Sequence, residues 1–151
     1  MDYLKREYPT QPIVGVGAII IRDCKILLVK RGSEPGRNKW SIPGGIVELG
    51  EKVHETTVRE VKEESNLEVE VHSLIDVVDN LESDKEDKLR YHFVILDFFV
   101  RLIGGNLKAG SDVLDVRWVP LAEVENYDLT RTFQDFFERN RELLQRFDSC
   151  L

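Results

Sequence analysis

The sequence predicts one α/β domain that spans residues 1–151. Apolar, β-branched runs that are typical of strands alternate with two segments whose apolar residues recur at helical spacing. A chain of this length can bury roughly two-thirds of its unfolded surface in a single core. With 42% hydrophobic and 32% charged residues, the composition is that of a folded globular domain rather than of a disordered chain.

Six segments are expected to be extended. They share β-branched or alternating apolar residues and are bounded by turn-forming residues such as glycine, proline and aspartate. The segments are residues 12–21, 25–30, 40–47, 68–78, 89–102 and 113–119.

Two helices are expected among these strands, each with an apolar stripe that would face the sheet. The first helix spans residues 52–65, and its inward side is expected to hold Val53, Thr57, Val58 and Val61. The second helix spans residues 129–147, and its inward side is expected to hold Phe133, Phe136, Phe137, Leu143 and Leu144.

Three connections are expected to be loops. Residues 31–39 form a polar stretch that is interrupted by glycine and proline. Residues 79–88 form a charged hairpin loop, which we interpret as solvated surface in preference to a substrate lid. Residues 104–106 have the Gly-Gly-Asn sequence of a tight turn.

The charge balance limits the range of partners. There are 28 acidic and 21 basic residues, which give a formal net charge of −7 and argue against a broad nucleic-acid-binding surface. A small nucleotide can still bind if a metal ion and a few arginines supply local positive charge. The first residues lack the apolar core of a signal peptide, and no apolar run could span a bilayer. We therefore expect a cytoplasmic protein with no membrane partner.

Three carboxylates are crowded on the first expected helix. Glu60, Glu63 and Glu64 lie at positions i, i+3 and i+4, so their side chains project from one helix face. Such a cluster repels itself unless a cation neutralises it. Several hard oxygen ligands suit Mg²⁺, and Mn²⁺ is expected to substitute for it. The spacing therefore predicts a metal site.

The same residues belong to a longer pattern that resembles the Nudix box of the Nudix hydrolases. Its positions are filled here by Gly45, Glu51, Arg59, Glu60, Val61, Glu63, Glu64 and Leu67. Asn66 stands where the family usually has glycine, and asparagine tolerates a left-handed backbone better than other non-glycine residues. We therefore expect the helix to end there. The resemblance implies the Nudix fold, a mixed β-sheet sandwiched between α-helices.

The resemblance also implies the reaction and its metal ligands. Hydrolysis of a phosphoanhydride needs charge neutralised on the phosphate oxygens, an aligned water molecule and a base. Glu63 and Glu64 are the expected metal ligands, and Glu60 shares the site. The Gly44 carbonyl is a further candidate ligand, because the glycine pair allows the backbone to approach closely.

Arg59 completes the expected set of catalytic residues. It can pair with a box glutamate or reach back to Glu51, and its planar guanidinium would then hold a carboxylate in one orientation. Glu51 is accordingly expected to orient Arg59 rather than to bind metal. Glu60 is the expected general base. Asp112 or Asp115 could take that role instead, since the family often places an acidic residue late in the chain near the site.

Two arginines and three aromatic residues are candidates for binding the substrate. Arg31 and Arg37 lie in the loop before the box and could hold the distal phosphates. Trp40, Tyr91 and Phe93 could stack on a base, although Trp40 and Phe93 are expected to belong to the core.

Taken with the resemblance, these residues predict a Mg²⁺-dependent pyrophosphohydrolase that cleaves a nucleoside diphosphate linked to another group. ADP-ribose or a similar ADP-sugar is the favoured substrate. The absence of proline between Pro43 and Pro120 counts mildly against it, because ADP-ribose enzymes often carry one downstream of the box. The alternatives are a nucleoside triphosphate pyrophosphatase that removes damaged nucleotides and a non-enzymatic ligand-sensing domain. A homodimer is left open.

Overall fold

The computed structural model describes residues 5–147. Its elements are β1 Ile13–Ile19, β2 Ile21–Arg22, β3 Lys25–Arg31, β4 Trp40–Ser41, β5 Gly44–Ile46, α1 Val53–Ser65, β6 Leu67–Ser83, β7 Leu89–Gly105, β8 Val113–Pro120, the 3₁₀-helix η1 Leu121–Asn126 and α2 Arg131–Arg146. The strands form two sheets, one in the order β5-β1-β7-β6 and the other in the order β2-β3-β4 with β8 on the free side of β3. Strands β1 and β7 run parallel and the other pairs are antiparallel, so the predicted mixed sheet is confirmed.

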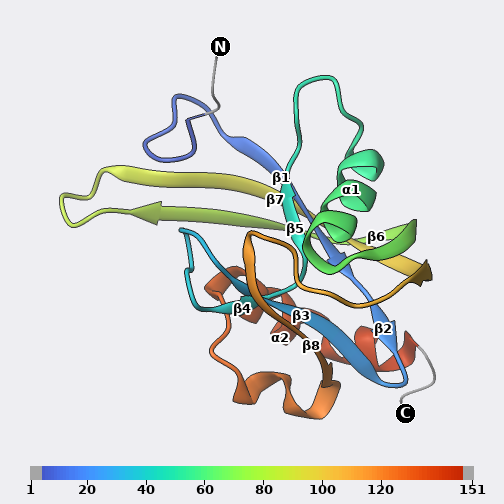
Figure 1. Cartoon of the computed structure of the whole chain (residues 1–151). Coiled ribbons are helices and arrows are strands. Elements are labelled where there is room, and N and C mark those ends of the chain that lie inside the picture. Colours follow the sequence, from blue (N-terminus) through green and yellow to red (C-terminus); the bar gives the residue numbers. More distant parts are fainter. Residues whose placement is uncertain (1–4, 148–151) are drawn as a thin grey trace.

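Helices cover the first sheet on opposite sides (Figure 1). Alternate side chains of a strand leave opposite faces of the sheet, and β1 follows this rule. Val16 and Ala18 pack in the cluster that contains Val61 of α1. Ile19 packs in a second cluster, which contains Phe136 of α2 and residues of the β3–β8 sheet. The first sheet is therefore the layer that carries α1 on one side and contacts α2 on the other.

Helix α1 ends where the sequence predicts and buries a slightly different face. Asn66 has φ 64° and ψ 12°, the expected left-handed conformation. The prediction that Val58 faces inward is wrong, since its exposure is 38%. Thr56 is fully buried instead, because its hydroxyl donates to Glu51 Oε1 at 2.6 Å and thereby joins α1 to the loop before it.

The predicted hairpin loop at residues 79–88 is shorter than expected, because residues 79–83 belong to β6 and only residues 84–88 connect the strands. Strands β6 and β7 stay paired as far as Ser83 and Leu89, and together they form an arm that projects from the body of the molecule (Figure 1). The turn is short because Asp84 Oδ1 accepts the backbone N–H groups of Glu86 and Lys88, each at 2.9 Å. The expected solvated loop is therefore confined to the tip of a two-stranded arm.

The predicted turn at residues 104–106 is also wrong. Gly104 and Gly105 are the last residues of β7, and Gly105 has φ +89°. A Cβ at Gly105 would lie 2.4 Å from the Asn66 carbonyl oxygen. The chain then continues as a longer loop over the end of α1, with Gly110 N–H donating to the Glu64 carbonyl at 3.0 Å.

Helix α2 closes the domain as predicted, with one exception. Phe133, Phe136, Phe137 and Leu144 are buried, whereas Leu143 is 37% exposed and does not belong to the inward face. The 3₁₀-helix before α2 was not expected. No helix among residues 5–147 is long and apolar enough to cross a membrane.

Candidate active site

The box carboxylates meet the glycine pair of β5. Glu64 Oε1 accepts the Gly44 N–H at 2.8 Å, so the end of α1 is tied to the strand that precedes it. The Glu60 carboxyl group lies over Gly45, where an added Cβ would come within 2.2 Å of Glu60 Cδ. Glycine is therefore required at position 45 if the carboxylate of Glu60 is to keep this place.

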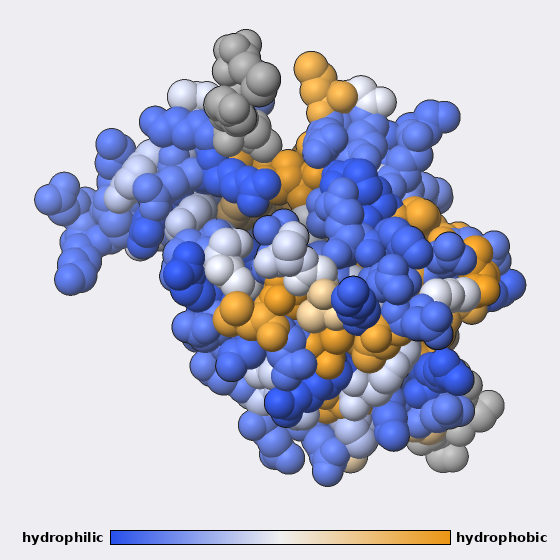
Figure 2. Space-filling view, viewed as in Figure 1, coloured by the Kyte–Doolittle hydropathy of each residue, from blue (hydrophilic) through white to orange (hydrophobic). Residues whose placement is uncertain are grey.

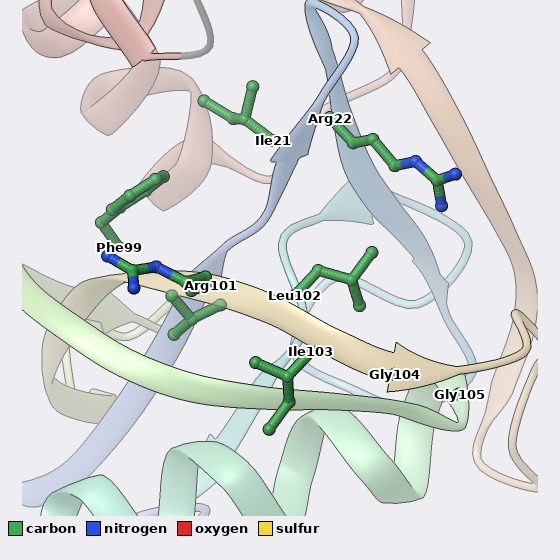
Figure 3. Close-up of a pocket in the computed structure, with 9 residues that line it drawn as sticks. Ile21, Arg22, Phe99, Arg101, Leu102, Ile103, Gly104 and Gly105 are labelled. Carbon is green, nitrogen blue, oxygen red and sulfur yellow. The ribbon is translucent and has the colours of Figure 1, made fainter.

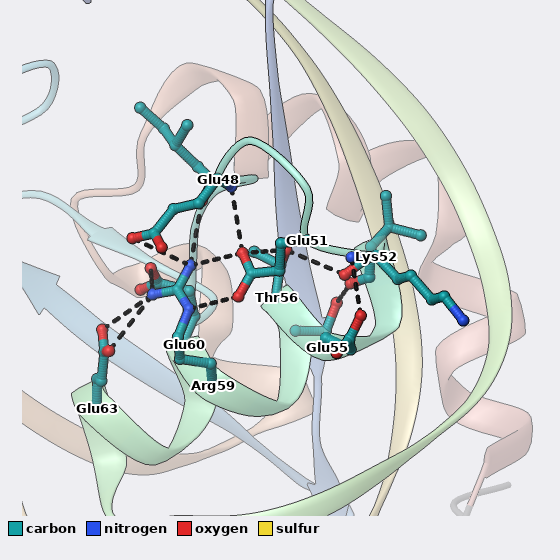
Figure 4. A network of polar contacts seen from close by, with 11 residues as sticks. Glu48, Glu51, Lys52, Glu55, Thr56, Arg59, Glu60 and Glu63 are labelled. Carbon is teal, nitrogen blue, oxygen red and sulfur yellow. Dashed lines mark hydrogen bonds and ion pairs between the residues drawn. The ribbon is translucent and has the colours of Figure 1, made fainter. Parts of the chain in front are cut away.

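Arg59 holds three of the glutamates at once (Figure 4). Its guanidinium donates to both oxygens of Glu51 at 2.7 and 3.0 Å, to Glu60 Oε1 at 2.8 Å and to Glu63 Oε2 at 3.3 Å. The Arg59 guanidinium, together with the Thr56 hydroxyl, lowers the pKa of Glu51 to about 2. Glu51 is thus held between Arg59 and Thr56, which is the geometry expected of a residue that orients Arg59.

Glu60 and Glu64 occupy a different environment from Glu63. Burial raises the pKa of Glu64 to about 7, and the nearby charges of Glu60 and Asp112 add to the shift, while the Gly44 N–H and Arg31 oppose it. Burial also raises the pKa of Glu60, although Arg59 opposes the shift. The Glu63 side chain is 58% exposed and lies on the outer side of the cluster. The carboxyl groups of Glu60 and Glu64 therefore place negative charge with little access to water beside Gly44 and Gly45.

The donor set suits a divalent cation even though it is not arranged as a cage. Within residues 5–147, no three histidine, cysteine or acidic side chains converge closely enough to hold a metal ion. Arg59 engages Glu60 and Glu63, and the Gly44 N–H engages Glu64. These oxygens are nevertheless hard ligands on adjacent turns, and burial makes the charges of Glu60 and Glu64 costly unless a cation is near. The residues present therefore fit Mg²⁺ or Mn²⁺.

The two aspartates considered as an alternative base lie in different places. Asp112 lies two residues after Gly110, whose N–H donates to the Glu64 carbonyl at 3.0 Å, and the charge of Asp112 adds to the raised pKa of Glu64. Asp115 lies on β8 and pairs with Arg117 at 3.0 Å, and Arg117 in turn lies over the Trp40 ring at 5.1 Å. Asp112 therefore remains a candidate beside Glu60, whereas Asp115 belongs to a separate group of side chains.

Of the two predicted phosphate-binding arginines, only Arg31 interacts electrostatically with a box carboxylate. Arg31 is half-buried at the end of β3, and its Nε donates to the Pro35 carbonyl at 2.7 Å. Burial lowers the pKa of Arg31, and the negative charge of Glu64 opposes that shift. Arg37 is exposed and makes no side-chain hydrogen bond or ion pair with the part of the chain that the structure describes.

The aromatic candidates are part of the core. Trp40, Tyr91 and Phe93 are exposed by only 7%, 5% and 8% respectively. Trp40 meets Tyr127 edge to face, with 5.2 Å between the ring centroids, and Tyr91 stacks on Phe93. The expectation for Trp40 and Phe93 is confirmed, and the idea that Tyr91 stacks on a base is not supported by its burial.

A separate hollow lies beside the last residues of β7 (Figure 3). Its two arginines are occupied by neighbours, since Arg22 faces Asp23 at 3.9 Å and Arg101 faces Glu70 at 3.6 Å. It contains none of the box residues and is not the catalytic site.

Sequence reasoning missed Thr56 as a residue of the site. Its hydroxyl donates to Glu51 Oε1 at 2.6 Å, so Thr56 helps to hold the glutamate that orients Arg59. A threonine within a helix gives no sequence signal for this contact, because the contact depends on how the loop before α1 packs.

The comparisons with known proteins agree with this geometry. A family model described as the NUDIX domain matches residues 11–147. An ADP-ribose pyrophosphatase of Methanocaldococcus jannaschii is 36% identical over 89% of this chain and 79% of its own length. A putative 8-oxo-dGTP diphosphatase 2 of Mycobacterium tuberculosis is 33% identical over 80% of this chain and 89% of its own length.

A solved structure of a MutT protein from Methanosarcina mazei superposes with a TM-score of 0.74 at 27% identity, and it covers 89% of this chain and 97% of that one. Several other curated relatives are longer, and the chain spans between 32% and 53% of four of them. The matched range contains all the box residues described above. The chain therefore belongs to the Nudix hydrolase family and is a pyrophosphatase that acts on phosphoanhydride bonds.

Proposed function

We propose that the protein hydrolyses the diphosphate linkage of a nucleoside diphosphate joined to another group, with ADP-ribose or a similar ADP-sugar as substrate and Mg²⁺ as cofactor. The observation that carries the proposal is the pair of buried carboxylates, Glu60 and Glu64, at the Gly44-Gly45 backbone. The ADP-ribose assignment is supported by the name of the archaeal relative at 36% identity. The reaction would release a nucleoside monophosphate.

We assign the metal-binding role to Glu60, Glu63, Glu64 and the Gly44 carbonyl. When bound there, Mg²⁺ supplies positive charge to the phosphate oxygens and makes the attacking water more acidic. Mn²⁺ is expected to substitute, since both ions take hard oxygen ligands. The chain itself supplies the positions of these oxygens, because Gly44 fixes Glu64 and Arg59 fixes Glu60.

The remaining steps are assigned to side chains that surround this cluster. Arg31, whose guanidinium lies within the field of Glu64, would hold a phosphate oxygen of the substrate, and we assign Arg37 the weaker role of attracting it. Glu60 would accept the proton from the attacking water. Asp112 is the alternative acceptor, since its charge also reaches Glu64. Arg59 would keep Glu60 in place throughout.

A nucleoside triphosphate is the second candidate substrate. The relative named as a putative 8-oxo-dGTP diphosphatase supports it, because the match covers 89% of that protein. Both candidates use the same attack on a phosphoanhydride, so the carboxylate cluster cannot distinguish them. A ligand-sensing domain without activity is the third candidate, and the intact set of box glutamates argues against it.

A substrate panel with a matched control tests the proposal. ADP-ribose, nucleoside triphosphates, dinucleoside polyphosphates and NADH would be compared for the wild type, for Glu64→Gln and for Glu142→Gln, an exposed glutamate of α2. We expect hydrolysis of ADP-ribose to AMP, a loss of at least about 100-fold in Glu64→Gln and no change in Glu142→Gln. Preferential turnover of a triphosphate would replace the substrate assignment. Full activity in Glu64→Gln would contradict the site.

A further inference from the structure

Asp97 is a buried carboxyl group on β7 that has no partner among residues 5–147. It is 3% exposed, and its side chain forms no hydrogen bond or ion pair with any of them. Arg139 and Asn140 of α2 donate instead to Asp76, the cross-strand neighbour of Asp97, at 2.7 and 2.8 Å. A buried carboxyl group without a partner costs stability, so packing gives no reason for an aspartate at this position.

The two carboxyl oxygens of Asp97 keep contact with solvent. Among the residues that the structure describes, no side-chain oxygen or nitrogen is sealed from solvent without a hydrogen bond. Because Asp97 makes no such bond, its slight exposure includes the carboxyl oxygens themselves. A polar group with the size of a water molecule can therefore reach them from outside the fold.

Strand register places Asp97 beside the glycine pair of the active site. Gly17 of β1 lies opposite Asp97 on one side and opposite Gly44 on the other. A Cβ at Gly17 would lie 2.3 Å from Asp97 Oδ1, so the carboxyl group leans over β1 toward β5. Two strand spacings separate the backbones of Asp97 and Gly44 by roughly 10 Å. A nucleoside spans a similar distance from its 5′-phosphate to the far edge of its base.

An apolar strip of the same sheet face adjoins these two positions. Gly15 lies two residues before Gly17, and it is opposite Ile46 of β5 and Ile95 of β7. Both isoleucines are partly exposed, and they pack against a small cluster that contains no residue of α2. The nearest side-chain atom to a Cβ at Gly15 would be Ile95 Cγ1, at 3.9 Å. Hydrophobic side chains reach the surface between the arm and α1, where β1 and β5 lie (Figure 2).

We propose that Asp97 determines specificity for adenine nucleotides, because its carboxyl group forms hydrogen bonds to the edge of the base. The inference rests on the function proposed above and names the part of the substrate that this residue contacts. In this arrangement the phosphates lie at Gly44 and the ring lies over Gly15. Apolar surface with a few placed polar groups is the usual composition of a small-molecule site.

The chemistry of the carboxyl group matches that of the base. Adenine presents its 6-amino donor beside a ring nitrogen that accepts, and an asparagine side chain pairs with the two groups at once. A protonated carboxyl group offers the same donor and acceptor. Burial raises the pKa of Asp97 to about 8, so the group holds its proton at neutral pH.

Three ligands without a phosphoanhydride bond separate contacts to the base from contacts to the phosphate. AMP carries the 6-amino group, purine riboside 5′-monophosphate lacks only that group, and ribose 5-phosphate lacks the whole base. Their Kd values would be measured by calorimetry at pH 7 with Mg²⁺ present. We expect the wild type to bind AMP about tenfold more tightly than purine riboside 5′-monophosphate, since the analogue leaves a buried polar group unpaired.

Substitutions of Asp97 test whether this preference depends on its carboxyl group. In Asp97→Ala we expect the Kd for AMP to rise about tenfold, to that of purine riboside 5′-monophosphate, while the Kd for ribose 5-phosphate stays within about twofold. Asp97→Asn keeps a donor and an acceptor in place and should retain AMP binding within about threefold. Asp79→Ala removes an exposed aspartate of β6 and is the matched control, for which all three Kd values should stay within about twofold.

The possible results distinguish this inference from the proposed function. Equal binding of AMP and purine riboside 5′-monophosphate to the wild type would overturn the role of Asp97, and this comparison needs no variant to fold. Equal weakening of all three ligands in Asp97→Ala would also overturn it, because it would show a structural effect. If the wild type hydrolyses ADP-ribose and Asp97→Ala keeps the preference for AMP, the inference is wrong and the proposed function stands. If the wild type hydrolyses nothing in the panel, the proposed function fails, and the Kd values still decide whether Asp97 contacts adenine.

Discussion

Asp97 is a buried carboxyl group whose removal should stabilise the protein at neutral pH. It lies on β7 opposite Asp76 of β6 and is only 3% exposed, and its carboxyl group accepts no hydrogen bond from any of residues 5–147. Burial raises its pKa to about 8, the negative charge of Asp76 adds to the shift, and Arg139 of α2 opposes it. An aspartate in an unfolded chain has a pKa of about 3.9.

The sign and size of the effect follow from that difference. Between pH 4 and pH 8 the folded protein keeps the proton that the unfolded chain releases, so stability falls as the pH rises, by about 1.4 kcal/mol per pH unit from this group alone. The contribution is complete below the unfolded pKa and is lost as the pH approaches the folded pKa. At pH 7 the accumulated loss is about 4 kcal/mol, which is an upper figure because real sites relax. Asparagine does not ionise and would avoid this loss.

Urea unfolding at pH 5, 7 and 8.5 would measure the effect in the wild type, in Asp97→Asn and in Asp79→Asn, an exposed control on the neighbouring strand β6. We expect Asp97→Asn to be more stable than the wild type at pH 7, by about 2 to 4 kcal/mol, with a smaller gain at pH 5. Asp79→Asn should follow the wild-type curve. A loss of stability in Asp97→Asn that is the same at all three pH values would refute the reasoning, because it would show that Asp97 is ionised or tightly hydrogen-bonded in the fold.

Three other substitutions test the geometry around the box, each by steady-state kinetics with circular dichroism as the check on folding. Gly45→Ala should lower kcat by about 100-fold, because the new Cβ would lie only 2.2 Å from Glu60 Cδ and would force the carboxyl group to move. Unchanged kcat would show that Glu60 has room to move. Glu51→Gln should lower kcat about tenfold with KM within twofold, since Arg59 loses a charged partner; a change in KM alone would assign Arg59 to substrate binding. Glu60→Gln should cut kcat steeply while the Mg²⁺ midpoint moves little if Glu60 is mainly the base, and near-normal kcat together with a collapse in Asp112→Asn would transfer that role.

The sequence predicted the features that depend on spacing along one element. A helix repeats every 3.6 residues, so its geometry places the side chains of Glu60, Glu63 and Glu64 on one side. A helix often ends at a residue with a left-handed backbone, and Asn66 is one of the few residue types that tolerate it. The strands and the apolar stripe of α2 follow from similar periodicities. These predictions needed no knowledge of what packs against each element.

The errors occurred where a neighbouring element decided the outcome. Val58 was expected inside and is exposed, because the Glu51 loop approaches α1 on the side of Thr56. The charged run at residues 79–88 was expected to be a loop, yet strand pairing continues through its first half, residues 79–83, where Asn80 is buried. Hairpin composition alone does not reveal how far two strands stay paired.

The site was predicted in part for the same reason. Local spacing identified the glutamates and Arg59, whereas only the folded chain separates Asp112 from Asp115 and half-buries Arg31 while it leaves Arg37 exposed.

The central claim is that the carboxylates at Gly44 and Gly45 bind a divalent cation that hydrolysis requires. The most direct measurement is a Mg²⁺ titration of EDTA-treated protein with ADP-ribose as substrate, run in parallel with calorimetric Mn²⁺ binding to the wild type and to Glu64→Gln. We predict no turnover without the metal, recovery with Mg²⁺ or Mn²⁺ but not with Na⁺, and Mn²⁺ binding that is at least about tenfold weaker in Glu64→Gln. Turnover that persists in EDTA, or equal Mn²⁺ affinity in the two proteins, would contradict the account.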